Sequence, residues 1–301
     1  MRILITGGTG LIGRPLCAAL LSAGHDLTVL SRKPESVKTK CGAAVKSIRS
    51  LNEWLPDMRF DAVINLAGEP IVDAPWTDQR KKCLWDSRVT LTEELISRIE
   101  NANHKPKVLL SGSATGYYGN SSDTMLDESA KPASDFGALL CSAWENAALK
   151  AVDSDVRVCL LRTGLVLDPS GGLLGGMLLP FKFGLGARIS SGAQWMSWIH
   201  IDDYIAIVLR LLEHPDANGS YNMTAPNPTT NAEFSATLAR VLHRPALFVA
   251  PAWLMTLFLG KRAYLLLGGQ RVLPSKAETL GYRFTYASLE GALRSLLGYR
   301  E

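Results

Sequence analysis

The first thirteen residues of the chain, MRILITGGTGLIG, constrain its fold more strongly than any other segment. Residues 2–5 form a short apolar run that is long enough for one buried parallel strand. Gly7, Gly10 and Gly13 follow it, and the apolar residues that come next recur at helical spacing. In such a unit the first glycine permits a tight turn, the second lets backbone N–H groups approach a pyrophosphate, and the third lets the helix pack on the strand. The segment therefore predicts the start of a dinucleotide-binding sheet, with the phosphates at the helix N-terminus.

The second predicted strand indicates which dinucleotide fits. Residues 26–30 (DLTVL) form this strand, and Ser31 and Arg32 follow it at the position where a ribose partner is expected. An acidic residue here would hold the 2′-hydroxyl of NAD, and the strand end has none. Arg32 offers a planar fork for a 2′-phosphate instead, with Ser31 as a hydroxyl donor and Lys33 as a point charge. The sequence favours NADP over NAD, and the alternative is that these residues form an ordinary solvated turn.

Later strand ends add further candidate cofactor contacts. Small residues follow the predicted strand at 61–66 and would let a flat ring lie against the backbone, at the sheet edge where ligands bind. Arg88 lies in a predicted helix over 77–101 and points either toward this cleft or to solvent. The candidate cofactor-binding residues are Gly7, Gly10, Leu11, Ile12, Gly13, Ser31, Arg32, Leu66, Ala67, Gly68, Arg88, Ser111 and Leu165.

Composition argues against several classes of protein. The chain has 301 residues and a net charge of +4 without a basic run of five residues, so nucleic-acid binding has no support. Its five cysteines are widely spaced and form no metal-ligand pattern, which predicts reduced thiols in a cytoplasmic protein and no metal site. The most apolar late stretch, residues 246–259, contains Pro251 and is too short to span a bilayer. We therefore expect no membrane partner.

The alternation of strand and helix patterns predicts the architecture. It continues to residue 167, which indicates an α/β fold: a Rossmann-type, doubly wound parallel sheet of the seven-strand type with helices on both faces. Beyond that point the pattern loosens, and the glycine-rich residues 168–176 predict a flexible flap. A clear helical pattern returns near residue 204, with Asp202 or Asp203 as its expected N-cap.

This pattern divides the chain into two predicted domains. The nucleotide-binding domain comprises residues 1–167 and about 196–225. A smaller substrate lobe comprises residues 168–195 and 226–301, so that it is built from two separated segments.

Several stretches together resemble the extended short-chain dehydrogenase/reductase superfamily. They are GGTGLIG at the start, NLAG at 65–68, SGSATGYYG at 111–119, RTGLVL at 162–167 and WIHIDD at 198–203. The chain is most similar to the atypical branch called epimerase family proteins, which are NAD-dependent epimerase/dehydratase-like with an appended C-terminal domain. The segment LLLGGQRVLP, at 265–274, resembles the signature of that domain. The resemblance covers essentially the whole chain and implies a Rossmann core, a small substrate lobe and NADP(H) as cofactor.

The resemblance also implies a catalytic set, and this chain lacks part of it. The superfamily uses a Ser together with a Tyr and a Lys spaced YxxxK, where the Lys lowers the pKa of the Tyr so that it exchanges a proton near neutral pH. Ser113 matches the Ser. When the following helix is aligned on Glu145, Gly137 and Cys141 stand where the Tyr and the Lys belong. The atypical branch generally lacks this pair, so the fold alone does not imply the activity.

The remaining catalytic candidates follow the predicted strand at 107–110. Ser113 is expected to polarise a substrate oxygen, and Tyr117 or Tyr118 to exchange the proton. We favour an NADP(H)-dependent oxidoreductase or epimerase that acts on an unidentified small molecule, as a monomer or homodimer. Two alternatives stay open: a protein that senses NADP(H) without turnover, and an interaction protein with an unused cleft. The intact glycine turn and Arg32 argue against the last of these.

Overall fold

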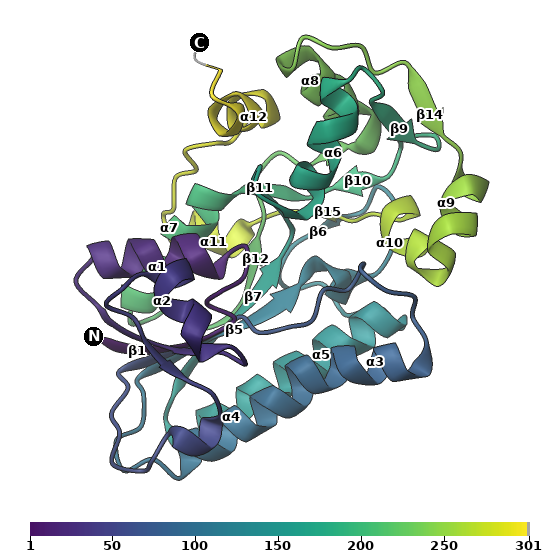
Figure 1. The fold of residues 1–301 in the computed structure, drawn as a ribbon. Helices are drawn as coiled ribbons and strands as arrows, with labels where there is room; N and C mark the ends of the chain where they lie inside the picture. Colours follow the sequence, from purple (N-terminus) through teal and green to yellow (C-terminus); the bar gives the residue numbers. More distant parts are fainter. Residues whose placement is uncertain (300–301) are drawn as a thin grey trace.

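Seven parallel strands form the central sheet of the computed structural model, which describes residues 1–299 apart from the side chains of residues 259 and 261 (Figure 1). From one edge to the other the strands are β12 (Gly219–Met223), β7 (Arg157–Thr163), β5 (Val108–Ala114), β4 (Ala62–Asn65), β1 (Arg2–Thr6), β2 (Asp26–Leu30) and β3 (Lys46–Ile48). Every neighbouring pair is parallel. The order reverses between β1 and β4, and the crevice at such a point is where open sheets bind ligands. The predicted doubly wound α/β fold is confirmed.

Helices cover both faces of this sheet (Figure 1). One face carries α1 (Gly13–Ser22), α2 (Val37–Cys41) and α7 (Ile201–Glu213), and the other carries α3 (Asp78–Trp85), α4 (Leu91–Glu100) and α5 (Phe136–Leu149). Strand β1 shows why both faces of the sheet must be covered by helices. Ile3 and Ile5 belong to the core beneath α1 and α7, whereas Leu4 between them belongs to the core beneath α4. Successive side chains of a strand point to opposite faces, so an unbroken apolar run is buried on both.

The helix predicted over 77–101 is interrupted in its middle. Residues Asp86–Thr90 form a π-helical turn, η3, between α3 and α4. A π turn widens the helix locally, and such turns are frequent at functional sites. Arg88 lies in this turn.

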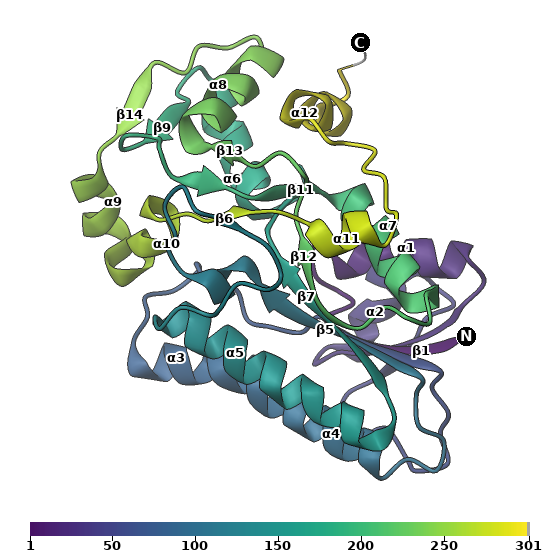
Figure 2. The ribbon, with the colours of Figure 1, turned by 180° about the vertical axis from the view of Figure 1, so that it is seen from behind.

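The smaller lobe packs above the sheet around a separate apolar core (Figure 2). Its helices are α6 (Gly172–Lys182), α8 (Asn231–Val241), α9 (Ala252–Leu259), α10 (Tyr264–Leu267) and α12 (Leu289–Leu297). Short strands pair as β9 (Ala187–Ile189) with β14 (Phe248–Ala250), and as β10 (Trp195–Met196) with β13 (Thr229–Thr230). Two further pairs join the lobe to the sheet: β8 (Leu165–Leu167) with β11 (Trp198–His200), and β6 (Met125–Leu126) with β15 (Arg271–Val272).

The remaining helical segments are short. They are η1 (Pro34–Ser36), η2 (Leu51–Glu53), η4 (Thr115–Tyr118), η5 (Lys150–Ser154), η6 (Gly260–Ala263) and α11 (Ser275–Thr279). Helix α11 packs against the sheet rather than the lobe, since Ala277 belongs to the core beneath α1 and α7. The predicted division into two domains therefore stays a prediction.

Two local predictions were wrong. The expected flap at 168–176 is partly helical, because α6 begins at Gly172 and buries Leu174 in the lobe core. Burial of an apolar face outweighs the low helix propensity of glycine there. The N-cap of α7 is His200, whose Nδ1 accepts a hydrogen bond from the backbone N–H of Asp202 at 3.0 Å. Asp203 is buried in the first turn and accepts from the Tyr282 hydroxyl at 2.7 Å.

Candidate functional site

The glycine turn between β1 and α1 has the shape that a pyrophosphate needs. Gly7 has a φ of +73°, and a side chain on it would come within 2.6 Å of the Leu66 backbone. A Cβ on Gly13 would lie 2.3 Å from the Gly7 carbonyl oxygen. Within the described residues, the backbone N–H groups of Leu11 and Ile12 donate no hydrogen bond. These unpaired donors at a helix N-terminus fit the charge and the size of a pyrophosphate.

The ends of three neighbouring strands are held in register by buried side chains. Asn65 accepts from the Thr6 hydroxyl at 2.6 Å and donates to Thr92 and Ser111 at 2.8 and 3.2 Å. The Thr6 hydroxyl in turn accepts from the Ala67 backbone N–H at 3.1 Å. This network fixes the backbone of residues Leu66–Gly68, which follow β4 beside the glycine turn and are called the strap below. Ser111 therefore supports the strap, and Leu66 and Ala67 are half-buried along it.

Arg32 lies at the rim of this crevice. Its side chain is 89% exposed, and its Nη1 donates to Glu69 Oε1 at 2.8 Å. Arg80 approaches the other oxygen of the same carboxylate at 3.4 Å. The hydrogen bond from Arg32 lowers the pKa of Glu69. Sequence reasoning missed Glu69, although it directly follows the NLAG segment. Ser31 accepts a hydrogen bond from the Lys33 backbone N–H at 3.2 Å.

Arg88 lies behind the strap rather than in solvent. Its Nη2 donates to the Glu69 carbonyl oxygen at 2.9 Å, and a Cβ on Gly68 would lie 2.8 Å from its guanidinium carbon. The guanidinium also lies 5.5 Å from the Trp144 ring centroid. Burial lowers the pKa of Arg88. Its visible role is to support the backbone at Gly68 and Glu69. Leu165, the last cofactor candidate, lies on β8, and its N–H donates to the Ser197 carbonyl oxygen at 2.8 Å.

A buried ion pair organises the candidate catalytic residues. Arg162, at the end of β7, donates from Nε and Nη2 to the two oxygens of Glu145 on α5 at 2.8 and 2.9 Å. The Ser113 hydroxyl donates to Glu145 Oε1 at 2.7 Å. The Tyr117 ring lies on the guanidinium, with 3.6 Å between the Arg162 Cζ and the ring centroid. The structure therefore brings together Ser113 and both candidate tyrosines around two charged residues that sequence reasoning did not assign to the site.

The two tyrosines have different surroundings. The Tyr118 hydroxyl donates to Asn222 Oδ1 at 2.7 Å and accepts from Arg162 Nη1 at 2.9 Å. Burial raises the pKa of Tyr118 to about 12. Tyr117 is only half-buried, and within the described residues its hydroxyl forms no hydrogen bond. Tyr117 is thus the better placed of the two to meet a substrate.

The positions of the missing Tyr–Lys pair lie on the first turns of α5. Gly137 offers no side chain, and its backbone N–H donates to the capping Asp135 at 2.8 Å. Cys141 is buried, and burial raises the pKa of its thiol to about 11. Neither position offers a group that exchanges a proton near neutral pH.

A pocket of about 360 Å³ opens between the segment that follows Tyr117 and the lobe. Its walls carry mostly polar side chains, among them Asn120, Asp123, Ser190, Gln194 and Trp195. The Trp195 indole N–H donates to Asp123 Oδ1 at 2.7 Å and so joins the two walls. The pocket suits a ligand that is rich in hydroxyl groups.

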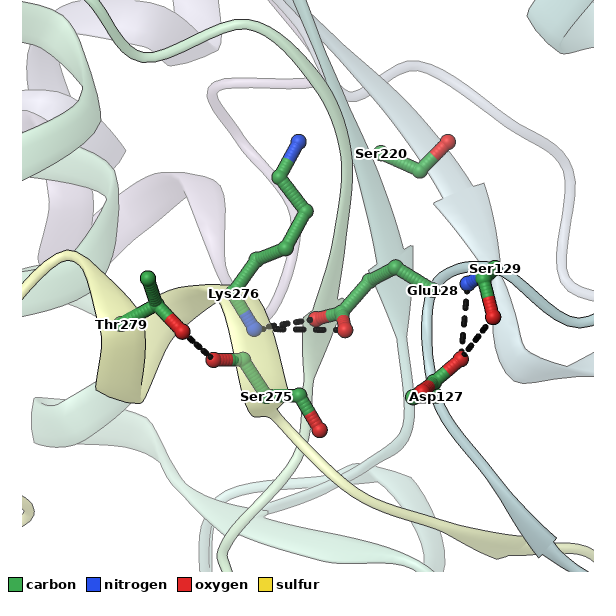
Figure 3. Close-up of a pocket in the computed structure, with 7 residues that line it drawn as sticks. All are labelled: Asp127, Glu128, Ser129, Ser220, Ser275, Lys276 and Thr279. Atoms are coloured by element: carbon green, nitrogen blue, oxygen red, sulfur yellow. Dashed lines mark hydrogen bonds between the residues drawn. The ribbon is translucent and has the colours of Figure 1, made fainter.

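A second pocket, of about 340 Å³, serves a structural joint instead (Figure 3). Glu128 lies in it and accepts from the backbone N–H of Lys276, at the start of α11, at 3.2 Å from each oxygen. The backbone N–H of Asn222 on β12 donates to the same carboxylate at 3.0 Å. Figure 3 shows the Lys276 side chain turned away from this carboxylate. Glu128 thereby fastens α11 to the edge of the sheet, and none of the candidate site residues lines this pocket.

Over the described part of the chain, no group of three or more potential ligand side chains is placed to hold a metal ion. Among these same residues, no helix is both long and apolar enough to cross a bilayer.

Comparison with known proteins places this arrangement in a family. Residues 3–224 match the NAD dependent epimerase/dehydratase family, and residues 250–296 match a domain of unknown function, DUF1731. The chain is 38% identical to the Arabidopsis thaliana chloroplastic homolog of the epimerase family protein SDR39U1, over 99% of this chain and 87% of the other. It is 36% identical to the epimerase family protein YfhF of Bacillus subtilis, over 100% and 99% of the two chains.

Solved structures agree with this assignment. The crystal structure of human SDR39U1 with NADPH has a TM-score of 0.91 and 35% identity, and the match covers 99% of each chain. A UDP-galactose 4-epimerase with 17% identity and a TM-score of 0.76 shares the fold, with 99% of this chain and 98% of the other covered. The chain belongs to the NAD dependent epimerase/dehydratase family, in the atypical extended short-chain dehydrogenase/reductase branch that carries the DUF1731 domain.

Proposed function

We propose that this protein is an NADP(H)-dependent oxidoreductase or epimerase-type enzyme that acts on a small, hydroxyl-rich carbonyl or alcohol. The observation that carries the proposal is Tyr117, which is half-buried with its ring on Arg162 and whose hydroxyl forms no hydrogen bond within the described residues. In this proposal Tyr117 takes the role of the absent Tyr as proton donor. The positive charge of Arg162, which lies against the Tyr117 ring, takes the place of the absent Lys.

The cofactor assignment is supported by the geometry of the crevice. Among the described residues, Leu11 and Ile12 offer unpaired N–H groups for the pyrophosphate, and Arg32 offers an exposed guanidinium for a 2′-phosphate. The human relative that covers nearly the whole chain was crystallised with NADPH. When bound, this cofactor supplies or accepts a hydride.

Each side chain of the cluster has a separate role in the proposed reaction. Tyr117 donates a proton to the substrate oxygen during reduction and takes it back during oxidation. Ser113 donates a hydrogen bond to the same substrate oxygen. To do so, its hydroxyl gives up the hydrogen bond that it donates to Glu145 in the structure. Glu145 and Arg162 hold both groups in place, and their mutual pairing keeps two buried charges compensated. Tyr118 positions Arg162 through its hydroxyl.

The test is single-turnover oxidation of bound NADPH with a panel of polar carbonyl compounds. Tyr117→Phe should slow the reaction by roughly 10²-fold or more, since it removes a general acid. Ser113→Ala should slow it less, and Tyr118→Phe should retain turnover. Tyr299→Phe, which alters an exposed tyrosine that follows α12, is the matched control. A wild-type rate in Tyr117→Phe would show that the proton comes from elsewhere.

A second candidate function is a sensor that binds NADP(H) without turnover. The absence of the Tyr–Lys pair at Gly137 and Cys141 favours it. If no carbonyl compound oxidises the bound NADPH while the cofactor still binds tightly, the sensor becomes the better assignment.

A further inference from the structure

The lobe carries an unusual concentration of exposed apolar side chains. Phe183, Leu247, Trp253, Leu257 and Phe258 are each between 67% and 83% exposed. Most soluble proteins expose large apolar residues singly, and a contiguous group marks an interaction surface.

These residues come from segments that adjoin one another. Strand β9, which follows the α6–Phe183 segment, pairs with β14, and α9 begins directly after β14. Gly184 lies against Pro245, which brings the end of α6 next to the segment that contains Leu247. Figures 1 and 2 both show β9, β14 and α9 along the outer side of the lobe, away from the sheet. We call this region the apolar face.

Charge is distributed as unevenly as hydrophobicity. Residues 169–201 and 234–277 contain none of the chain's 28 Asp and Glu residues and eight of its 32 Lys and Arg residues. The rest of the chain therefore holds 24 basic and 28 acidic residues and is net negative. Lys182, Arg188 and Arg244 are exposed next to the apolar face.

We propose that the apolar face docks on the surface of a lipid bilayer that contains anionic headgroups. Aromatic and aliphatic side chains flanked by Lys and Arg, without acidic residues, are the composition of segments that lie in a membrane interface. Trp253, Leu257 and Phe258 on α9 enter the interface, while the basic residues meet the headgroups. This revises the expectation of no membrane partner, which considered only a spanning segment.

The same charges make a second copy of this chain a poor occupant. Two apolar faces brought together would place their basic residues opposite one another, without an acidic residue from either segment to compensate them. An anionic surface removes this repulsion.

The docking helix is continuous with the candidate site. The chain runs from α9 into Tyr264, whose hydroxyl accepts from the Asn120 backbone N–H at 3.1 Å. Asn120 lines the polar pocket. Docking therefore holds the pocket near the bilayer surface.

Vesicle co-sedimentation of the full chain tests the proposal. The protein should sediment with vesicles of phosphatidylcholine mixed with phosphatidylglycerol and stay in solution with pure phosphatidylcholine, and added salt should weaken the binding. The double variant Leu257→Asp/Phe258→Asp should bind the mixed vesicles at least roughly tenfold more weakly than the wild type. Leu55→Asp, which alters an exposed apolar residue outside the lobe, is the matched control and should bind like the wild type.

Charge and folding are separated by two further measurements. Lys182→Glu/Arg244→Glu should also lower vesicle binding by roughly tenfold or more, because each reversal weakens the attraction to anionic lipid. NADPH binding and the melting temperature should remain those of the wild type in all of these variants. Equal binding to both vesicle types, no vesicle binding, or a dimer in sedimentation equilibrium that Leu257→Asp/Phe258→Asp dissociates would overturn the proposal.

Discussion

The two ends of the candidate cleft differ in what they offer to a ligand. At the glycine turn, the N–H groups of Leu11 and Ile12 form no hydrogen bond with any residue that the structure describes, and Arg32 is exposed. At the other end, Ser113, Tyr118 and Arg162 already bond to one another or to Glu145. One end is thus open and ready for an anion, whereas the other is a closed network with Tyr117 at its margin. Substitutions in the network around Arg162 should therefore affect stability and turnover more than cofactor affinity. Substitutions at the glycine turn and Arg32 should mainly affect cofactor affinity.

The largest effect is expected from the buried ion pair. Arg162→Met leaves the Glu145 carboxylate buried without its cation, which should lower the free energy of unfolding by about 3–5 kcal/mol. Chemical denaturation measures it. The double variant Glu145→Leu/Arg162→Met removes both charges and should recover part of the loss. If Arg162→Met alone unfolds like the wild type, the catalytic end is not held by this pair.

The next effect concerns the 2′-phosphate. Arg32→Ala should weaken NADPH binding by roughly tenfold or more, since a hydrogen bond to a charged group contributes about 1.5–3 kcal/mol. NADH binding should hardly change. Fluorescence titration with both cofactors measures the ratio, and Lys46→Ala, which alters an exposed lysine at the start of β3, serves as the control. Equal losses for the two cofactors would contradict the assignment of Arg32.

A smaller loss is expected from steric crowding at the glycine turn. Gly13→Ala places a Cβ 2.3 Å from the Gly7 carbonyl oxygen, and overpacking of this kind costs about 1–3 kcal/mol. Thermal unfolding should show the loss, and NADPH should bind more weakly because the turn must shift. Gly176→Ala on α6 meets no atom within 4 Å and should unfold no earlier than the wild type.

The smallest effect should come from Glu69. The Glu69 carboxylate forms an ion pair with the Arg32 guanidinium and would repel a phosphate that binds there. Glu69→Gln should therefore tighten NADPH binding by a few-fold. Exposed ion pairs of this type contribute about 0.2–1 kcal/mol. Isothermal titration in wild-type and Arg32→Ala backgrounds checks it. The gain should vanish without Arg32, and a gain that persists would mean that Glu69 acts on the cofactor by another route.

Much of the fold could be predicted because its causes are local. The apolar run at residues 2–5, the glycines and the strand that ends at Leu30 each act within a few residues, and the observed sheet contains these strands. The flap at 168–176 could not be predicted, because burial of Leu174 in the lobe core overrides the local preference of its glycines. The prediction of the α7 N-cap was wrong for a similar reason, because Asp203 accepts a hydrogen bond from Tyr282, which is distant in the sequence.

The sequence by itself determined the parallel sheet, the glycine turn and the position of Arg32, since strand, turn and charge are properties of contiguous residues. Only the tertiary structure decided which of two adjacent tyrosines has a hydroxyl without a hydrogen bond to the described residues. Tyr118 meets Asn222 from 104 positions away and Tyr117 does not, and no spacing in the chain encodes that contact. The same holds for Glu145 and Arg162, which face each other because α5 packs on the sheet next to β7. Local patterns specify elements, whereas packing of distant elements decides which polar groups remain free for chemistry.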